Sequence, residues 1–317
     1  MPSHSSQLGA SMLAIHLVAF LFGMTGILGS LIEADPNTIT FGRAAFAVLS
    51  LSPLLLLPAL QSSRQSSAPQ SSLPEEQVDD SHWSRLPARL QLIGYTGLSG
   101  LLLAVHWVTF FMSVKIAGVA LATLGFSSFA AFITAIEWVI ARGQISRADW
   151  LRTLGVTSGL VLMTPSFNLA DENTYGFLLG LASGLSFAAM AVVNSRKLAG
   201  QNPIRIARNQ NLIVALLLLP LALTHLPRIS VVSWMWLAVL GILCTGLSHS
   251  LFVYSLKRLR VSMAGLVVAL EPVYAIAVAW MLFAQVPQAR TLLGGLLIVG
   301  SILGVRAATA SRDHIRK

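Results

Sequence analysis

Ten apolar segments follow one another along almost the whole of this 317-residue chain, and each has about the length that a helix needs to cross a lipid bilayer. Only 10% of the residues are charged, whereas a soluble domain carries about a quarter, and the mean hydropathy is +0.74. The sequence therefore predicts an all-α integral membrane protein with ten transmembrane helices, at residues 12–32, 36–60, 90–113, 117–140, 148–166, 175–195, 203–224, 231–255, 261–284 and 290–308.

The basic residues indicate an orientation and not a nucleic-acid partner, because they are scattered singly between the apolar segments despite a net charge of +9. Of the Lys and Arg residues outside the segments, 17 lie in the tails and alternate loops and 3 in the other loops. By the positive-inside rule, both termini are expected to face the cytoplasm. We expect a multi-pass protein of a bacterial inner membrane. The sequence leaves the oligomeric state open and is compatible with a monomer.

One stretch, residues 61–88, departs from the apolar pattern. It is rich in Ser, Gln and Pro and almost free of aliphatic side chains, so it cannot bury enough apolar surface to offset the entropy of the chain. The sequence predicts a disordered cytoplasmic loop here, and a regulatory or partner-binding role is the alternative.

The two halves of the chain are related by an internal repeat. An offset of 167 aligns Pro36 with Pro203 and Arg43 with Gln210, and an offset of 142 aligns five further landmarks of the third and fourth helices, among them Trp138 with Trp280. The offsets differ by about the length of the Ser-rich loop, so a single insertion explains both. Each half has five predicted helices, an odd number, so the second half enters the membrane from the opposite side.

This repeat divides the chain into a tail at 1–11, a first five-helix repeat at 12–166, a second at 167–308 and a tail at 309–317. The five-plus-five plan resembles the EamA family of the drug/metabolite transporter superfamily, as do the segments PNTITFGRAAF, FFMSVKIAGVALATL and YSLKRLRVSMAGLVVALEPVYA. The resemblance implies a central cavity between inverted halves and transport of a small metabolite, often an amino acid, with export as the expected direction.

Glu271 is the predicted proton-coupling residue, because it falls about ten residues into the ninth segment, near the centre of the bilayer. Pro272 follows it and removes one helical hydrogen bond, which predicts a kink. A carboxyl group in that place could bind and release a proton during transport. The alternative is a neutral acid that only satisfies the backbone groups freed at the kink.

Several other polar and aromatic residues fall within apolar segments and are candidates to line the cavity. Arg43 could clamp a substrate carboxylate, or could extend to the membrane surface and pair with Glu33 or Asp35. The histidines could contact the substrate or be satisfied in the protein interior, and Trp107 could stack on a planar ligand. The predicted substrate-binding residues are Arg43, His106, Trp107, Asn194, Gln210, His249 and Tyr274.

The glycines at 176, 180 and 184 recur every four residues and predict a small face that packs closely against another helix. No metal or cofactor site is expected, because the chain has one cysteine, Cys244, and the histidines at 106 and 249 have no Cys or Asp neighbours that would complete a metal site. No enzyme motif such as HExxH or GxSxG occurs, so we do not expect an enzyme. The predicted function is secondary transport of a small polar or amphipathic metabolite. A membrane enzyme and a channel or assembly subunit are the alternatives.

Overall fold

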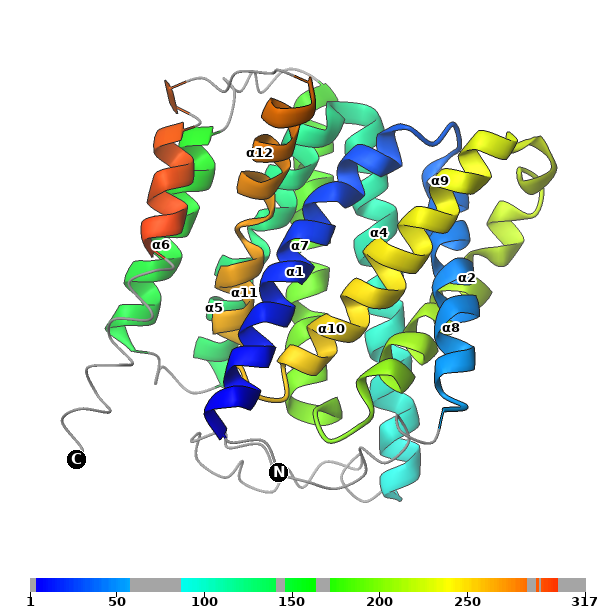
Figure 1. The fold of residues 1–317 in the computed structure, drawn as a ribbon, viewed down its shortest axis with the longest axis horizontal. Coiled ribbons are helices and arrows are strands. Elements are labelled where there is room, and N and C mark those ends of the chain that lie inside the picture. The colour runs from blue at the N-terminus through cyan, green and yellow to red at the C-terminus, as the bar shows by residue number, and fades with distance from the viewer. Residues whose placement is uncertain are drawn as a thin grey trace.

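The computed structural model describes residues 4–57, 87–140, 146–163, 172–283, 289–290 and 292–301. This described part of the chain is helical and contains no strand (Figure 1). Its elements are α1 (His4–Ser30), α2 (Pro36–Leu54), α4 (Ala88–Ser127), α5 (Phe129–Ile140), α6 (Arg147–Met163), α7 (Glu172–Val193), η1 (Asn194–Leu198), α8 (Pro203–Ala222), η2 (Leu226–Arg228), α9 (Val231–Gly241), η3 (Ile242–Leu247), α10 (Ser248–Ser255), α11 (Val261–Val268), α12 (Glu271–Phe283) and an unlabelled apolar helix, Leu292–Ser301.

Seven helical stretches in the described residues are long and apolar enough to cross a membrane: Gln7–Ser30, Ala88–Val119, Leu121–Ile140, Thr174–Leu198, Pro203–Ala222, Val231–Ser255 and Val261–Val278. The protein is therefore an all-helical integral membrane protein that crosses the bilayer several times. The 19-residue α2, the 17-residue α6 and the shorter helix Leu292–Ser301 do not reach this standard. The count of ten stays a prediction.

Two helices begin earlier than the predicted membrane segments. The N-terminal tail was expected to end at residue 11, but α1 begins at His4, because the residues from Leu8 onward continue the apolar helix. The Ser-rich loop was expected to extend to residue 88, but α4 begins at Ala88, immediately after Pro87. The remainder of that loop lies outside the described residues, as does the tail at 309–317.

The 40-residue α4 is interrupted at Gly118: the membrane-spanning stretch Ala88–Val119 ends at this break, and the next stretch, Leu121–Ile140, begins in the last turns of α4 and continues through α5. A straight helix of that length would be about 60 Å long, twice the thickness of the hydrocarbon core. Gly118 interrupts it with φ of 79°, a conformation that glycine adopts without a steric penalty. The sequence placed the boundary between its third and fourth segments at 113–117, close to this break.

The helices α2 and α8 begin in the same way, at positions that the internal repeat aligns. Asp35 caps α2 and Asn202 caps α8, and each side chain accepts hydrogen bonds from the backbone N–H groups two and three residues ahead. Each cap is followed by a proline, Pro36 or Pro203, at the first helical position. Both helices therefore start with the same local chemistry.

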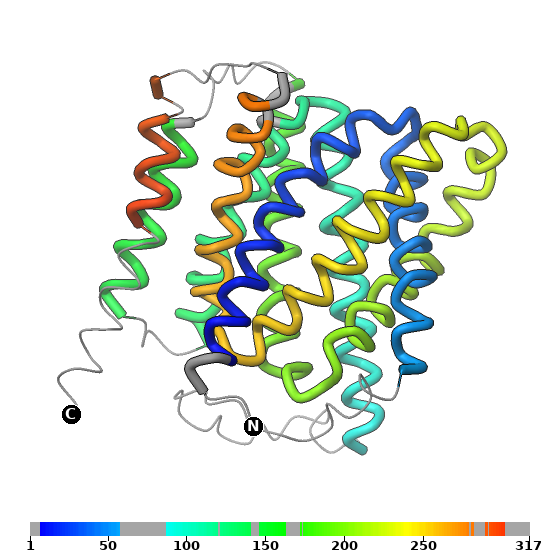
Figure 2. Tube along the Cα trace, viewed as in Figure 1, coloured from blue at the N-terminus to red at the C-terminus, as the bar shows by residue number. Residues whose placement is uncertain are grey.

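The bundle is held together by long pairs of helices. The helix α7 packs along α4, and α2 packs along α8. In the centre, α1 and the α9–η3–α10 segment cross the bundle side by side (Figure 2). The predicted small face is confirmed, because a Cβ atom added at Gly180 would lie 3.0 Å from the Cα atom of Gly125 on α4. The close approach of α4 and α7 therefore depends on both glycines.

Candidate functional site

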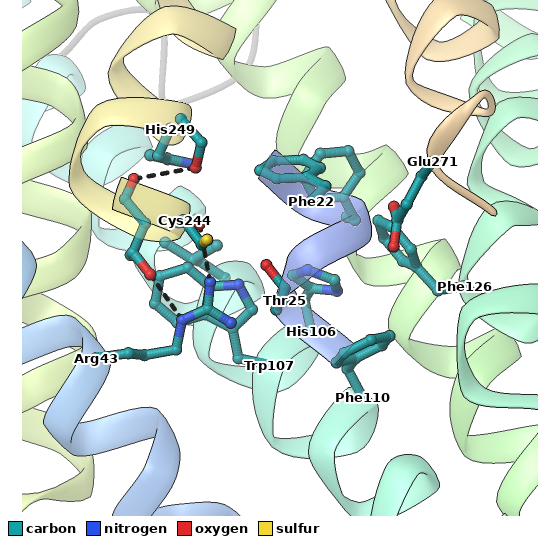
Figure 3. A pocket seen from close by; sticks show the side chains of 14 residues that line it. Phe22, Thr25, Arg43, His106, Trp107, Phe110, Phe126, Cys244, His249 and Glu271 are labelled. Carbon is teal, nitrogen blue, oxygen red and sulfur yellow. Dashed lines mark hydrogen bonds between the residues drawn. The ribbon is translucent and has the colours of Figure 1, made fainter. Parts of the chain in front are cut away.

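A cavity lies at the centre of the bundle, where both halves of the chain contribute helices (Figure 3). Five of the residues predicted from the sequence meet there: Arg43, His106, Trp107, His249 and Glu271. The full lining comprises Phe22, Thr25, Arg43, Leu103, His106, Trp107, Phe110, Phe126, Phe187, Cys244, Thr245, Ser248, His249 and Glu271. The wall thus combines five Phe and Trp rings with seven polar or charged side chains from separate helices, so it can contact both the apolar and the polar parts of a small molecule.

Arg43 lies inside the protein, and the expectation that it extends to the surface or pairs with the acidic turn before α2 is wrong. Its side chain is 2% exposed. Its Nε donates to Thr245 Oγ1 at 2.8 Å, and its Nη2 donates to the backbone carbonyl of Cys244 at 3.2 Å. The guanidinium carbon lies 4.1 Å from the centroid of the Trp107 ring. Nη1 has no hydrogen-bond partner, and among the described residues no carboxylate forms a salt bridge with Arg43.

Glu271 begins α12, directly after the break that separates it from α11, and Pro272 follows in the first helical turn. The helix break therefore falls where the sequence predicted a kink. Glu271 is 1% exposed, and its Oε2 atom has no hydrogen-bond partner. Figure 3 shows the carboxyl group on the opposite side of the cavity from Arg43. A buried carboxyl with an open oxygen can accept a donor from a ligand or hold a proton.

His106 stands among the aromatic side chains of the cavity wall. Its Nδ1 atom lies 2.7 Å from Ser183 Oγ on α7, and its ring centroid lies 4.8 Å from that of Phe126 and 5.0 Å from that of Phe187. The side chain is 5% exposed and lines the cavity. His106 is therefore held in a fixed orientation with its ring at the cavity.

His249 connects the cavity to a buried polar network. Its Nε2 atom lies 2.6 Å from Gln210 Oε1, an oxygen that can only accept, so Nε2 carries the proton. Gln210 Nε2 donates to Asn194 Oδ1 at 2.7 Å and also to Ser99 Oγ. Ser99 Oγ in turn donates to Asn194 Oδ1 at 2.7 Å. Asn194 and Gln210 thus lie behind the cavity wall, and they reach the cavity only through His249.

Tyr274, the remaining predicted residue, is not part of the cavity lining among the described residues. It lies on α12 and is half-buried against α1, where its hydroxyl is 3.1 Å from His16 Nδ1 and its ring centroid is 6.2 Å from that of Phe20. The expectation that Tyr274 lines the cavity is wrong for this structure.

Three hydroxyl residues that hold the side chains of the site were not predicted from the sequence: Ser99, Ser183 and Thr245. Serine and threonine are frequent in membrane helices, where they bond to their own backbone, so their presence gave no signal. Glu137 on α5 was not predicted either. This residue is 7% exposed, and one oxygen of its carboxyl group has no hydrogen-bond partner. That residue could have been noticed as an acid near the end of an apolar segment.

The described residues contain no group of three or more His, Cys, Asp and Glu side chains that could hold a metal ion. What the cavity offers is a set of hydrogen-bonding and charged groups on an aromatic wall. Such a set can bind a small organic molecule.

Comparison with known proteins identifies the family. A profile described as the EamA-like transporter family matches residues 9–164 and 174–307, which together make up almost the whole chain. The chain belongs to the EamA-like transporter family. The matched ranges include every residue of the cavity lining in this EamA-like protein.

Two individual proteins are similar to this EamA-like chain. An uncharacterized transporter of Archaeoglobus fulgidus is 29% identical over 150 residues, which are 47% of this chain and 53% of the relative. The match thus spans about half the length of that curated relative. A protein of known crystal structure has a TM-score of 0.69 at 19% identity, with 98% of this chain and 99% of the other covered. At that identity the likeness shows a shared fold.

Proposed function

We propose that this protein is a secondary transporter that moves a small amino-acid-like metabolite through the central cavity by alternating access. The observation that carries the proposal is the pair of buried ionisable groups at the cavity, each with one polar atom unpaired. Arg43 Nη1 would donate to the carboxylate of such a substrate, and Glu271 Oε2 would accept from its ammonium group. A buried charge without a partner is costly in a membrane, so a ligand that supplies one is favoured.

The inverted repeat supports alternating access. Trp107 and His249 are aligned by the offset of 142, and Arg43 and Gln210 by the offset of 167. In the structure Arg43 contacts Trp107, and Gln210 contacts His249, so each half holds the equivalent contact. The packing of α7 on α4 is likewise matched by that of α1 on α10. We propose ten membrane helices in two inverted five-helix repeats, since such a pair can open one central site to either face.

We further propose that Glu271 couples transport to protons. Glu271 lines the cavity, its Oε2 atom has no hydrogen-bond partner, and no basic side chain among the described residues forms a salt bridge with it. A carboxyl that is not held by a basic partner can exchange its proton for a substrate ammonium group as the cavity opens to each side.

Substrate counterflow in proteoliposomes tests the proposal. Purified protein is reconstituted with an unlabelled L-amino acid inside, and uptake of the same radiolabelled amino acid is measured across a panel of amino acids. We expect counterflow for at least one of them, and a loss of about tenfold or more in Arg43→Gln. Arg205→Gln, an exposed arginine on α8, is the matched control and should behave as wild type. Absence of counterflow for the whole panel would contradict the proposal. Efflux from preloaded cells would measure the proposed direction, export.

A further inference from the structure

The η3 segment, Ile242–Leu247, is a π-helical turn inserted between α9 and α10. A side-chain hydrogen bond spans this wider turn, because the hydroxyl of Thr245 donates to the carbonyl of Leu240, five residues earlier, at 2.8 Å. Such turns are rare and occur most often at functional sites. The π-helical turn that separates α9 from α10 therefore calls for a functional explanation.

The helix α2 lies directly against this turn. A Cβ atom added at Gly241 would lie 2.7 Å from the backbone carbonyl oxygen of Arg43, and one added at Gly246 would lie 2.9 Å from Ser50 Oγ. Positions five apart differ by about 140° around an α-helix and would not meet the same neighbour. The extra residue of the π-helical turn brings both glycines onto α2. The turn therefore fixes how closely Arg43 approaches η3.

Two consecutive residues of η3 hold the guanidinium group of Arg43. The hydroxyl of Thr245 accepts from Nε, and the carbonyl of Cys244 accepts from Nη2 (Figure 3). The Trp107 ring covers one face of the group at 4.1 Å. A guanidinium has five N–H groups. The two on Nη1 and the second one on Nη2 are not used by these bonds, so Nη1 and Nη2 keep an adjacent pair of donors on a side chain that lines the cavity.

We infer that η3 fixes the orientation of the Arg43 guanidinium group and that Thr245 is the positioning residue. The remaining pair of N–H donors then makes the site selective for a planar oxyanion, so that a carboxylate binds more tightly than the corresponding amide. The inference rests on the proposed function in taking this cavity as the ligand site. A fixed fork of two parallel donors matches the two oxygens of a carboxylate, whereas a carboxamide offers one oxygen and two donors of its own.

Thr245 suits this role because its hydroxyl acts in both directions. It donates to Leu240 within η3 and accepts from Arg43 on α2, so it ties the orientation of the guanidinium to the π-helical turn. Valine has the same shape and neither function, and it would leave Nε buried without an acceptor. Serine keeps both bonds. The pair of substitutions separates the hydroxyl from the packing of the side chain.

Binding of benzoate and benzamide, measured by calorimetry on the purified full-length protein, tests the inference. These probes have the same shape and differ in the carboxylate. We expect wild type to bind benzoate about tenfold or more tightly than benzamide, and Thr245→Val to lose most of that preference while Thr245→Ser keeps it. Thr96→Val is the matched control, because Thr96 is a buried residue of α4 whose hydroxyl donates to its own helix. It should retain the preference.

A second variant keeps the test decisive if Thr245→Val does not fold. Arg43→Lys keeps the positive charge, but a lysine ammonium group cannot bind η3 at two points and also present two parallel donors to a ligand. This variant should therefore also lose the preference for benzoate. Retention of the wild-type preference in either variant, or its absence in wild type, would overturn the inference. Failure of transport is a separate result: lack of counterflow with an intact benzoate preference would contradict the proposed function alone.

Discussion

At the scale of single residues, a guanidinium and a carboxyl group line the cavity without being exposed to water. Only some of their hydrogen-bonding atoms have partners in the protein. Arg43 has two hydrogen bonds and one aromatic face, and Glu271 retains an open oxygen. Charged residues within apolar segments are conspicuous in a sequence, so both could be predicted as functional. Their partners could not, because Thr245 lies 202 positions from Arg43 and no local pattern links them.

Replacing Glu271 by Gln tests its proposed role in proton coupling. The amide keeps the size and hydrogen bonding of the carboxyl but cannot titrate. Uptake driven uphill by a proton gradient should therefore fail, while counterflow down a substrate gradient survives. The two activities are measured on the same proteoliposomes, with Glu172→Gln, an exposed glutamate of α7, as the control. Equal retention of both activities would leave Glu271 with only the role of bracing the helix break.

Gly23 offers a test of how α1 packs on the helix break beside Glu271. A Cβ atom there would lie 2.9 Å from the backbone carbonyl oxygen of Glu271 and 3.3 Å from the backbone nitrogen of Ala275. Backbone atoms cannot swing away, so Gly23→Ala should destabilise the fold by about 1–3 kcal/mol. Gly9→Ala, whose Cβ meets nothing within 4 Å, should not. Thermal unfolding in detergent measures both, and equal midpoints would show that α1 is not held against α12 as described.

At the scale of elements, four helical segments are joined by the network of Ser99, Asn194, Gln210 and His249. Gln210 is central to it, because its amide bonds to all three of the others. Gln210→Leu would leave these buried partners unsatisfied, and we expect the midpoint of thermal unfolding to fall by several degrees. Gln201→Leu, at the turn before α8, is the control. An unchanged midpoint in Gln210→Leu would mean that the network contributes no stability.

Some elements follow from the sequence and others do not. The prolines at 36 and 203, each after a capping residue, mark where α2 and α8 begin, and the glycines at 176, 180 and 184 predict the face that α7 presents to α4. The π-helical turn of η3 could not be predicted in this way. Gly241 at the end of α9 and Gly246 in η3 are five residues apart, which does not match the repeat of an α-helix, and both glycines contact α2.

At the scale of the whole molecule, the duplication that is detectable in the sequence corresponds to equivalent contacts in space. Arg43 meets Trp107 in the first half as Gln210 meets His249 in the second. The two halves differ at these positions, since one carries a cation and the other an amide. The cavity is therefore asymmetric, and in the proposed function Arg43 in the first half and Glu271 in the second supply the charged groups for binding.

Alternating access itself is tested most directly by the one cysteine of the chain, Cys244, which lines the cavity and is buried. A membrane-impermeant thiol reagent is applied to right-side-out and to inside-out vesicles, with Cys244→Ser as the blank. A cavity that opens to each face in turn predicts alkylation from both sides, together with loss of counterflow once Cys244 is modified. Alkylation from one side only, or from neither, would contradict alternating access through this cavity.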